Sequence, residues 1–410
     1  MYKDNVEWIS YTYILYINIS LIPLDPSKPV PPTVIDDLLY EQLNKVYHSI
    51  ISAGERGKLA NTTFLGDKTY EESLGGLLTM LDQIYANSPY SYTLKSSRDS
   101  LKLFEDNISY LTIKPKKHEL ITQGKAIYTG VKNDNTDNGK NYYGFDTGHR
   151  NYNTTTNTIG GLATFEYGLT DKTSVGLVVG GNNQSINFKG SSEVEGTSVY
   201  VGTFAKTEMN NFRFMGGLGY QYTSVDADRE VSNGYDSFKT NDKYDVNSYN
   251  AFLEAKYVYE GTQNWRVEPK ARLSYYSINQ GSVDEGYNPG QLSIEVDKAS
   301  SDTLDLEVGV DFVKTVQLEK GKLNNIFSLG VINTLGSDSK KLRGRILGAN
   351  KKGSDFEIQE TELPDLSGKA SYNLELEQTN GMIYTAGVSI EFSKDYNRNV
   401  NATIGIGYKF

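Results

Sequence analysis

The sequence predicts a mainly β protein: a closed antiparallel barrel of twelve strands that spans a membrane. We expect a polar α-helix in its pore and a short helical region ahead of it. From residue 125 onward the hydrophobic period changes from 3.6 to 2, and short connections alternate with long ones. The chain also ends in an alternating strand whose last residue is aromatic. In a membrane barrel one face of each strand contacts lipid and the other faces a polar lumen, which accounts for these patterns.

The first part of the chain is an apolar run at residues 8–24, and prolines make residues 23–32 extended. A signal peptide needs a basic start and a small-residue cleavage site, and the run has neither. Its alternation of tyrosine and isoleucine is typical of a β-strand. We therefore expect residues 1–33 to be the remnant of a longer exported passenger whose signal lies upstream. A degenerate signal peptide is the alternative.

Two amphipathic helices are predicted within residues 34–90. Apolar residues recur at spacings of three and four over residues 35–50 and again over residues 70–85. Each stripe is wide enough to pack against the other helix or against a neighbouring domain.

A third helix is predicted at residues 92–111, within a pore-spanning segment at residues 91–120 that Lys114-Pro115 would terminate. Its apolar stripe is narrow, and polar residues occupy the remaining surface. Such a composition fits a solvated surface helix, and it also fits a helix threaded through a polar channel. The residues that would contact the channel wall are Lys95, Arg98, Asp99, Lys102, Glu105 and Asp106.

The barrel is predicted at residues 121–410. The twelve strand ranges are 125–132, 156–169, 173–186, 196–207, 212–225, 246–260, 265–278, 303–318, 323–335, 369–378, 381–393 and 400–410. Tilted strands of about ten residues cross an apolar band of about 25 Å. The polar positions that alternate with the apolar ones give the candidates for the lumen. They are Arg213, Glu254, Lys256, Arg266, Glu268, Lys270, Arg272, Glu307, Asp311, Glu375 and Glu391.

The predicted connections alternate in length. The longer ones lie at residues 133–155, 187–195, 226–245, 279–302, 336–368 and 394–399. A barrel of the outer membrane has short periplasmic turns and long outer loops, so we expect the end near Phe410 to be periplasmic. A large soluble β-sandwich is the alternative fold, with the charged positions of residues 266–272 as its solvated outer face.

The last strand carries its apolar side chains on one face. In a soluble protein this face and its open edge would promote aggregation, whereas in a barrel the edge pairs with the first strand. The outward residues are Ile404, Ile406, Tyr408 and Phe410.

A polar helix, a twelve-stranded C-terminal barrel and the ending Tyr408-Lys409-Phe410 follow one another here. In this order they resemble the translocator domain of a monomeric autotransporter, the type V secretion system, over residues 90–410. The resemblance implies that the outer-membrane assembly machinery recognises the terminal strand. It also implies that the passenger passes to the cell surface while the helix remains in the pore. Charges of both signs on helix and wall would form wet pairs of about 0–1 kcal/mol each; the alternative is a polar lumen without specific pairing.

Two features depart from that family. Residues 1–90 contain no repeated β-coils of a large passenger. Some members cut themselves in the pore helix at an Asn–Asn bond, but here Asn107 precedes Ile108, so we expect no self-cleavage.

Composition and motifs exclude several other classes. The absence of cysteine excludes thiol catalysis, and the net charge of −10 argues against a nucleic-acid partner. His48, His118 and His149 are dispersed, and no catalytic or nucleotide-binding motif is present. We expect no cofactor, metal or catalytic residue.

We also expect a monomer in the bacterial outer membrane, with its N-terminal region at the cell surface. Its expected partners are membrane lipid, the barrel assembly machinery and its own passenger segment. The alternatives are a stand-alone porin or adhesin barrel and an outer-membrane lipase or protease, for which His149 near Asp146 is the only hint.

Overall fold

The computed structural model describes residues 37–55, 69–86, 88–133, 141–147, 154–188, 192–232, 236–336, 342–393 and 398–410. The predicted segment at residues 1–33 and His149 lie outside the described residues. None of the helices in the described ranges is both long enough and apolar enough to cross a membrane.

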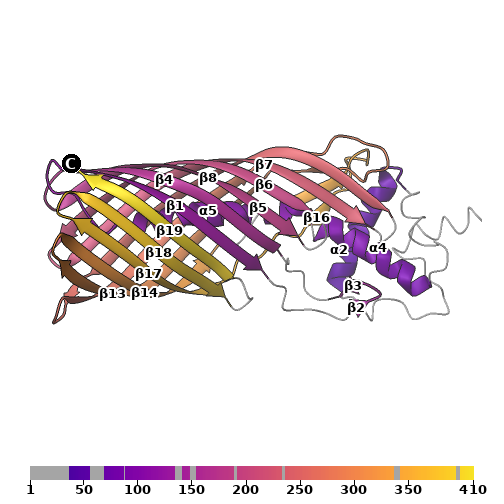
Figure 1. Ribbon diagram of the computed structural model, residues 1–410. Helices are drawn as coiled ribbons and strands as arrows, with labels where there is room; N and C mark the ends of the chain where they lie inside the picture. Colours follow the sequence, from indigo (N-terminus) through magenta and orange to yellow (C-terminus); the bar gives the residue numbers. More distant parts are fainter. Residues whose placement is uncertain are drawn as a thin grey trace, which may run out of the picture.

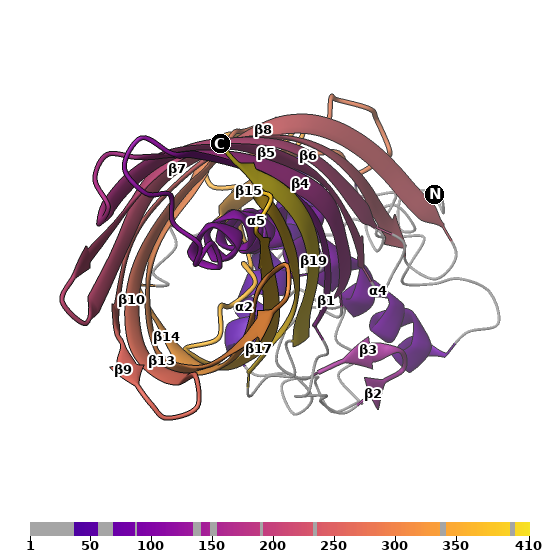
Figure 2. The same cartoon turned by 60° about the vertical axis from the view of Figure 1, so that its left-hand side comes forward.

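The predicted barrel of twelve antiparallel strands is confirmed (Figures 1 and 2). Strands that follow one another in the sequence are neighbours in the wall, and the first strand pairs with the last from Ile121 opposite Lys409 to Lys132 opposite Arg398. This pairing closes the sheet and leaves no open edge. The strands are β1 (Leu120–Asn133), β4 (Thr154–Gly168), β5 (Thr173–Phe188), β6 (Glu193–Met209), β7 (Phe212–Ser232), β8 (Ser237–Tyr257), β10 (Trp265–Gln280), β13 (Ala299–Leu318), β14 (Gly321–Leu335), β17 (Leu366–Gln378), β18 (Met382–Ser393) and β19 (Arg398–Lys409). A two-residue strand, β9 (Tyr259–Glu260), pairs with the start of β10.

Side chains alternate along the wall because successive residues of a strand point to opposite faces. In β10, Trp265, Leu273 and Tyr275 are exposed on the outside, whereas Glu268 and Arg272 are buried on the inside. The apolar face therefore points outward, which is the reverse of a soluble sandwich.

The predicted loops at residues 187–195 and 226–245 are wrong in extent. Strand β7 continues to Ser232 and β8 begins at Ser237, so most of the second range forms a hairpin. Its inward side chains, such as Ala227 and Phe238, are buried, but its outward positions include Asp226 and Lys243. These outward residues are charged because this hairpin projects beyond the apolar band, and the sequence therefore resembled a polar loop.

A small α/β layer lies at the end of the barrel opposite the C-terminus (Figure 1). Helices α2 (Asp37–Ser52) and α4 (Tyr70–Tyr85) pack on each other and on a four-stranded sheet built from the connections that follow β10 and β14. Its strands are β11 (Val283–Asp284), β12 (Ile294–Val296), β15 (Leu342–Ile346) and β16 (Phe356–Ile358). We call these two helices and four strands the cap.

The cap has an apolar core that is continuous with the buried apolar residues of the barrel lumen. Its fully buried side chains include Leu43 and Ile50 from α2, Leu78 from α4, and Ile294 and Phe356 from the sheet. A hairpin of β2 (Asn141–Tyr142) and β3 (Phe145–Asp146) packs on α4. Burial of large aliphatic side chains stabilises such a layer by about 1.5–3 kcal/mol for each.

The polar helix lies inside the barrel (Figure 2). A short 3-10 turn, η2 (Pro89–Tyr92), leads into α5 (Thr93–Ser109), and the chain then continues without regular structure to β1. The sequence predicted a helix at residues 92–111, and α5 ends two residues before that, at Ser109. It ends earlier because Thr112 donates hydrogen bonds from its backbone N–H and its hydroxyl to Glu375, which holds the chain extended.

Candidate functional site: the pore helix and the barrel wall

The narrow apolar stripe of α5 faces one part of the wall. Leu101, Phe104 and Ile108 are buried, and the Phe104 ring stacks on Tyr200 of β6 with 4.5 Å between ring centroids. Gly180 of β5 makes this approach possible, because a Cβ at that position would lie 2.8 Å from a carbon of the Phe104 ring. The remaining circumference of the helix makes polar contacts.

The half of α5 nearer the cap, which we call its outer half, is basic and meets acidic residues of the wall. The Arg98 guanidinium donates to Asp305 of β13 at 2.6 Å and to Thr334 of β14 at 3.2 Å. Lys102 donates to Glu391 of β18 at 2.7 Å. Three strands are thus joined to this half of the helix.

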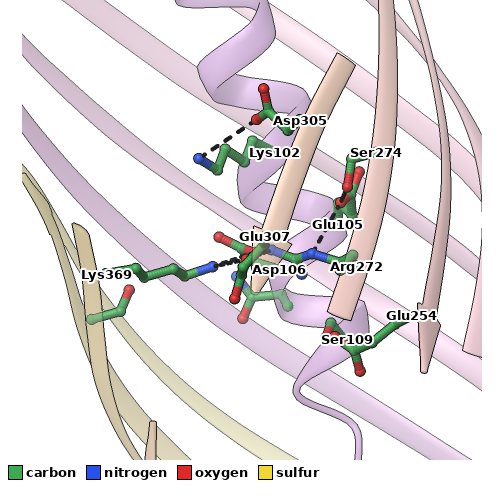
Figure 3. A network of polar contacts seen from close by, with 12 residues as sticks. Lys102, Glu105, Asp106, Ser109, Glu254, Arg272, Ser274, Asp305, Glu307 and Lys369 are labelled. Atoms are coloured by element: carbon green, nitrogen blue, oxygen red, sulfur yellow. Dashed lines mark hydrogen bonds and ion pairs between the residues drawn. The ribbon is translucent and has the colours of Figure 1, made fainter. Parts of the chain in front are cut away.

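The half of α5 farther from the cap, which we call its inner half, is acidic and meets basic residues of the wall (Figure 3). Asp106 accepts hydrogen bonds from Arg272 of β10 and Lys369 of β17, both at 2.7 Å. The same two cations also contact Glu307 of β13. Glu105 accepts from Asn250 of β8 at 3.1 Å and from Ser274. The charged side chains of this cluster are buried, so the wet pairs that the sequence predicted are wrong for this part of the lumen.

Further contacts fix the inner end of the segment. Ser109 donates to Glu254 of β8 at 2.7 Å, and Lys206 donates to the carbonyl oxygen of Ile113 at 3.2 Å. With the Thr112–Glu375 contact, the chain is held by the wall along its whole path through the barrel.

The charge order of α5 runs against the helix dipole. A helix favours acidic residues at its N-terminus and basic ones at its C-terminus, by about 0.3–1 kcal/mol for each. Here Lys95 lies in the first turn and Asp106 in the last. The intrinsic stability of the helix therefore does not account for the order, whereas the complementary charges of the wall do.

Apart from Arg98, Lys102, Glu105 and Asp106, whose wall contacts are given above, the predicted charged residues divide into three groups. Glu254, Arg272, Glu375 and Glu391 contact α5 or the residues directly after it. Lys95 and Asp99 pair with each other within the helix at 2.7 Å. The remaining lumen candidates have ion pairs with other residues of the wall: Arg213 and Arg266 with Glu268, Lys256 and Lys270 with Asp311, and Lys270 also with Glu307.

Several wall residues that contact the pore segment were missed by the sequence analysis, Asp305 and Lys369 among them. Asp305 binds Arg98, and Lys369 binds Asp106. Asp305 has the same parity as Glu307 and Asp311, and Lys369 has the same parity as Glu375. The alternation thus contained the signal for both.

The outward residues of β19 lie on the lipid-facing surface. Ile404 is 67% exposed and Phe410 is 66% exposed, while Ile406 and Tyr408 share their face. Tyr408 and Phe410 also contact each other edge to face, with 4.7 Å between centroids.

The described residues contain no group of three histidine, aspartate or glutamate side chains arranged to hold a metal ion.

Comparison with known proteins identifies the family. The family model described as Autotransporter beta-domain matches residues 128–389. The chain belongs to this autotransporter family. A search of curated proteins found no match. An autotransporter β-domain is an outer-membrane barrel that translocates a passenger, and this is the function of the barrel described above.

Two solved autotransporter structures share the fold. The translocator domain of the autotransporter NalP from Neisseria meningitidis aligns with a TM-score of 0.57 and 13% identity, over 80% of this chain and 99% of that one. The β domain of the Bordetella autotransporter BrkA aligns with a TM-score of 0.52 and 11% identity, over 71% of this chain and 99% of that one.

Proposed function

We propose that the segment ahead of α5 passes through the barrel to the cell surface, and that α5 then stays in the pore as its plug. The observation that carries this proposal is the match in charge between helix and wall. Arg98 and Lys102 meet Asp305 and Glu391, while Asp106 meets Arg272 and Lys369. A helix that only passed through the lumen would not need partners of the correct sign at each level.

The direction of the chain supports the same proposal. Helix α5 begins beside the cap, and its end leads into β1 at the end of the barrel where the C-terminus lies (Figure 1). With that end in the periplasm, the cap and everything before Asp37 lie outside the cell. We assign residues 1–33 to the end of the passenger, residues 34–90 to a surface unit, residues 91–120 to the plug and residues 121–410 to the translocator.

We further propose that the barrel works as a monomer and that the assembly machinery of the outer membrane reads β19. The exposed face of Ile404, Ile406, Tyr408 and Phe410 supports this assignment, because these side chains are accessible from outside the wall and the edge of β19 is open until it pairs with β1. The proposal assigns the barrel a carrier function, without catalysis of its own.

The experiment is protease accessibility of an epitope tag placed at the N-terminus of the full chain. On intact cells, added protease is expected to remove the tag while the barrel keeps its heat-modifiable mobility in a gel. Protection of the tag until the outer membrane is permeabilised contradicts the proposed topology. A periplasmic protein detected in the same cells controls for membrane integrity.

A further inference from the structure

A buried charged cluster joins the cap to the start of the pore helix. Arg229 lies on the part of β7 that projects toward the cap, and Glu285 lies in the connection between β11 and β12. Their side chains are 1% and 0% exposed. The guanidinium donates twice to the carboxylate, Nε to Oε1 and Nη2 to Oε2, at 2.6 Å in both cases.

The remaining partners of this cluster come from both sides of the junction. Tyr90 of η2, three residues before α5, donates its hydroxyl to Glu285 at 2.8 Å. The backbone N–H of Ile294 donates to the same carboxylate at 2.7 Å, and Arg229 donates to the carbonyl oxygen of Leu292 at 2.8 Å. Glu285 is therefore the point at which the barrel, the cap sheet and the chain leading into α5 meet.

The first residue of α5 is held by the β7–β8 hairpin, which also carries Arg229. Thr93, the first residue of α5, shares a hydrogen bond of 2.6 Å with the hydroxyl of Tyr244 on β8. The ring of Tyr244 contacts Tyr90 edge to face at 5.7 Å. None of the hydrogen bonds of the cluster in the described part of the chain reaches the lumen pairs of Asp305, Arg272 or Lys369.

The cap also covers the outer end of α5. A cavity of about 550 Å³ lies between them, lined by Leu38 and Gln42 of α2, Lys95 and Arg98 of α5, and residues 357–363. Backbone hydrogen bonds tie that last segment to η2, from Thr361 to Ser91 at 3.1 Å, and to the end of α4, from Gln359 to Tyr85 at 2.9 Å.

We propose that Arg229 and Glu285 are positioning residues that anchor the outer end of the pore helix through Tyr90, and so stop α5 from sliding back toward the periplasm. This rests on the proposed function, in which α5 stays in the pore after export. Outward sliding is resisted by the link from Ser109 to β1, which the wall holds at Thr112 and Ile113, and the Arg229–Glu285 cluster adds resistance to inward movement. A buried ion pair specifies one geometry and is costly to break, which suits this task.

The test measures the register of α5 inside the barrel of intact cells. The chain has no cysteine, so two introduced cysteines can be joined by a short thiol-to-thiol cross-linker without background. Ser100 and Asn182 are in contact at 2.7 Å, so the pair S100C and N182C reports the native register. The pair S96C and N182C reports a helix that has slipped inward by about one turn.

In the otherwise unchanged chain we expect cross-linking of the native pair and little of the slipped pair. In the Glu285→Ala or Arg229→Ala background, the rate for the slipped pair is expected to rise by about tenfold, which corresponds to about 1.4 kcal/mol. Glu285→Gln keeps the shape and most hydrogen bonds, so it should give a smaller rise. It also serves as the informative variant if Glu285→Ala does not fold.

The matched control is Arg345→Met, which removes an ion pair of the cap sheet with Asp355 and Glu295 that does not touch η2. It should leave the slipped pair at the unchanged level. An equal rise in this control would overturn the proposal, since general loosening of the cap would then be the cause. An unchanged register in folded Glu285→Ala and Glu285→Gln would overturn it as well. The tag experiment above is read on the same cells, so a failure of the proposed topology is recognised separately.

Discussion

Arg272 joins the pore helix to the wall through carboxylates of both. It contacts Asp106 and Glu105 of α5 and Glu307 of β13, and all four side chains are buried. The cost of removing charge from water is recovered here only because each carboxylate has several donors. The residue is thus more important for the position of the helix than an exposed pair would be.

Replacement of this residue gives the first prediction. Arg272→Met leaves Asp106 and Glu307 short of a buried partner, and the free energy of unfolding should fall by about 3–5 kcal/mol. Arg213→Met is the matched control, because Arg213 lies at the rim with 34% of its side chain exposed, and it should cost about 1 kcal/mol or less. Urea unfolding of the barrel in lipid vesicles measures both. Equal losses for the two variants would mean that the buried contacts of Arg272 contribute no more to the free energy of unfolding than the exposed pair of Arg213 does.

Glu285 gives a prediction about pH. Burial alone would raise its pKa, but the Arg229 guanidinium and the hydrogen bonds from Tyr90 and Ile294 hold the pKa of this carboxyl below its usual range. Burial beside this carboxylate raises the pKa of Tyr90 well above its usual range, so its hydroxyl stays a donor. The folded-state pKa of Glu285 is lowered, so its contribution to stability is complete above the unfolded value. It is lost as the pH falls through the folded value.

Protection of the cap from protease should therefore stay constant from pH 7 down to about 4.3 and decrease below that, because the unfolded chain then binds a proton at Glu285 that the folded carboxylate does not. Other carboxylates also titrate in this range, so Glu285→Gln is the control. This variant should be less protected at pH 7 and should lose less on acidification. The same acid loss in both chains would remove Glu285 as its source.

At the scale of elements, alternation along the chain was enough to predict all twelve strands, but not where each one ends. The hairpin of β7 and β8 extends beyond the lipid, where outward residues such as Asp226 and Lys243 no longer need to be apolar. The alternation of polar and apolar residues identifies a strand only where one face contacts lipid and the other faces the polar lumen. The strands of the cap are two to five residues long and are too short to have a period.

The lipid-facing side of β19 gives an element-scale prediction. Ile404→Arg places a charge on a side chain position that is 67% exposed to lipid, and this should cost about 2–4 kcal/mol near the middle of the membrane. Thr403→Arg, one residue away on the lumen side, should cost less because it meets polar neighbours. The amount of heat-modifiable barrel in outer-membrane fractions compares the two. A larger loss for Thr403→Arg would reverse the assignment of the faces.

The pore helix gives the second prediction at this scale. A barrel that begins at Thr112 lacks α5 and the two cap helices, α2 and α4, so its conductance in a planar bilayer should rise several-fold above that of the full chain. The physical reason is that the buried side chains of α5 fill the centre of the lumen. Unchanged conductance would mean that the helix does not obstruct the pore.

At the scale of the whole molecule, charge and hydrophobicity have separate functions. The apolar exterior holds the barrel in the membrane, while the charges of the lumen hold one segment of the chain. The alternation predicted the lumen side of residues such as Glu307 and Glu391. It could not predict which of them meet the helix, because that depends on how far each strand is shifted along the barrel axis relative to the others. Arg229 and Glu285 could not be paired from the sequence for the same reason, since 56 residues separate them.

The central claim is that one and the same chain has its N-terminus outside the cell and α5 inside the barrel. Cells that express the chain with S100C, N182C and an N-terminal tag allow both properties to be measured together. The tag is labelled on intact cells, the thiols are cross-linked, and the labelled chains are separated on a gel. We predict that most surface-labelled chains carry the cross-link. Labelled chains without it, or cross-linked chains that are never labelled, would contradict the account.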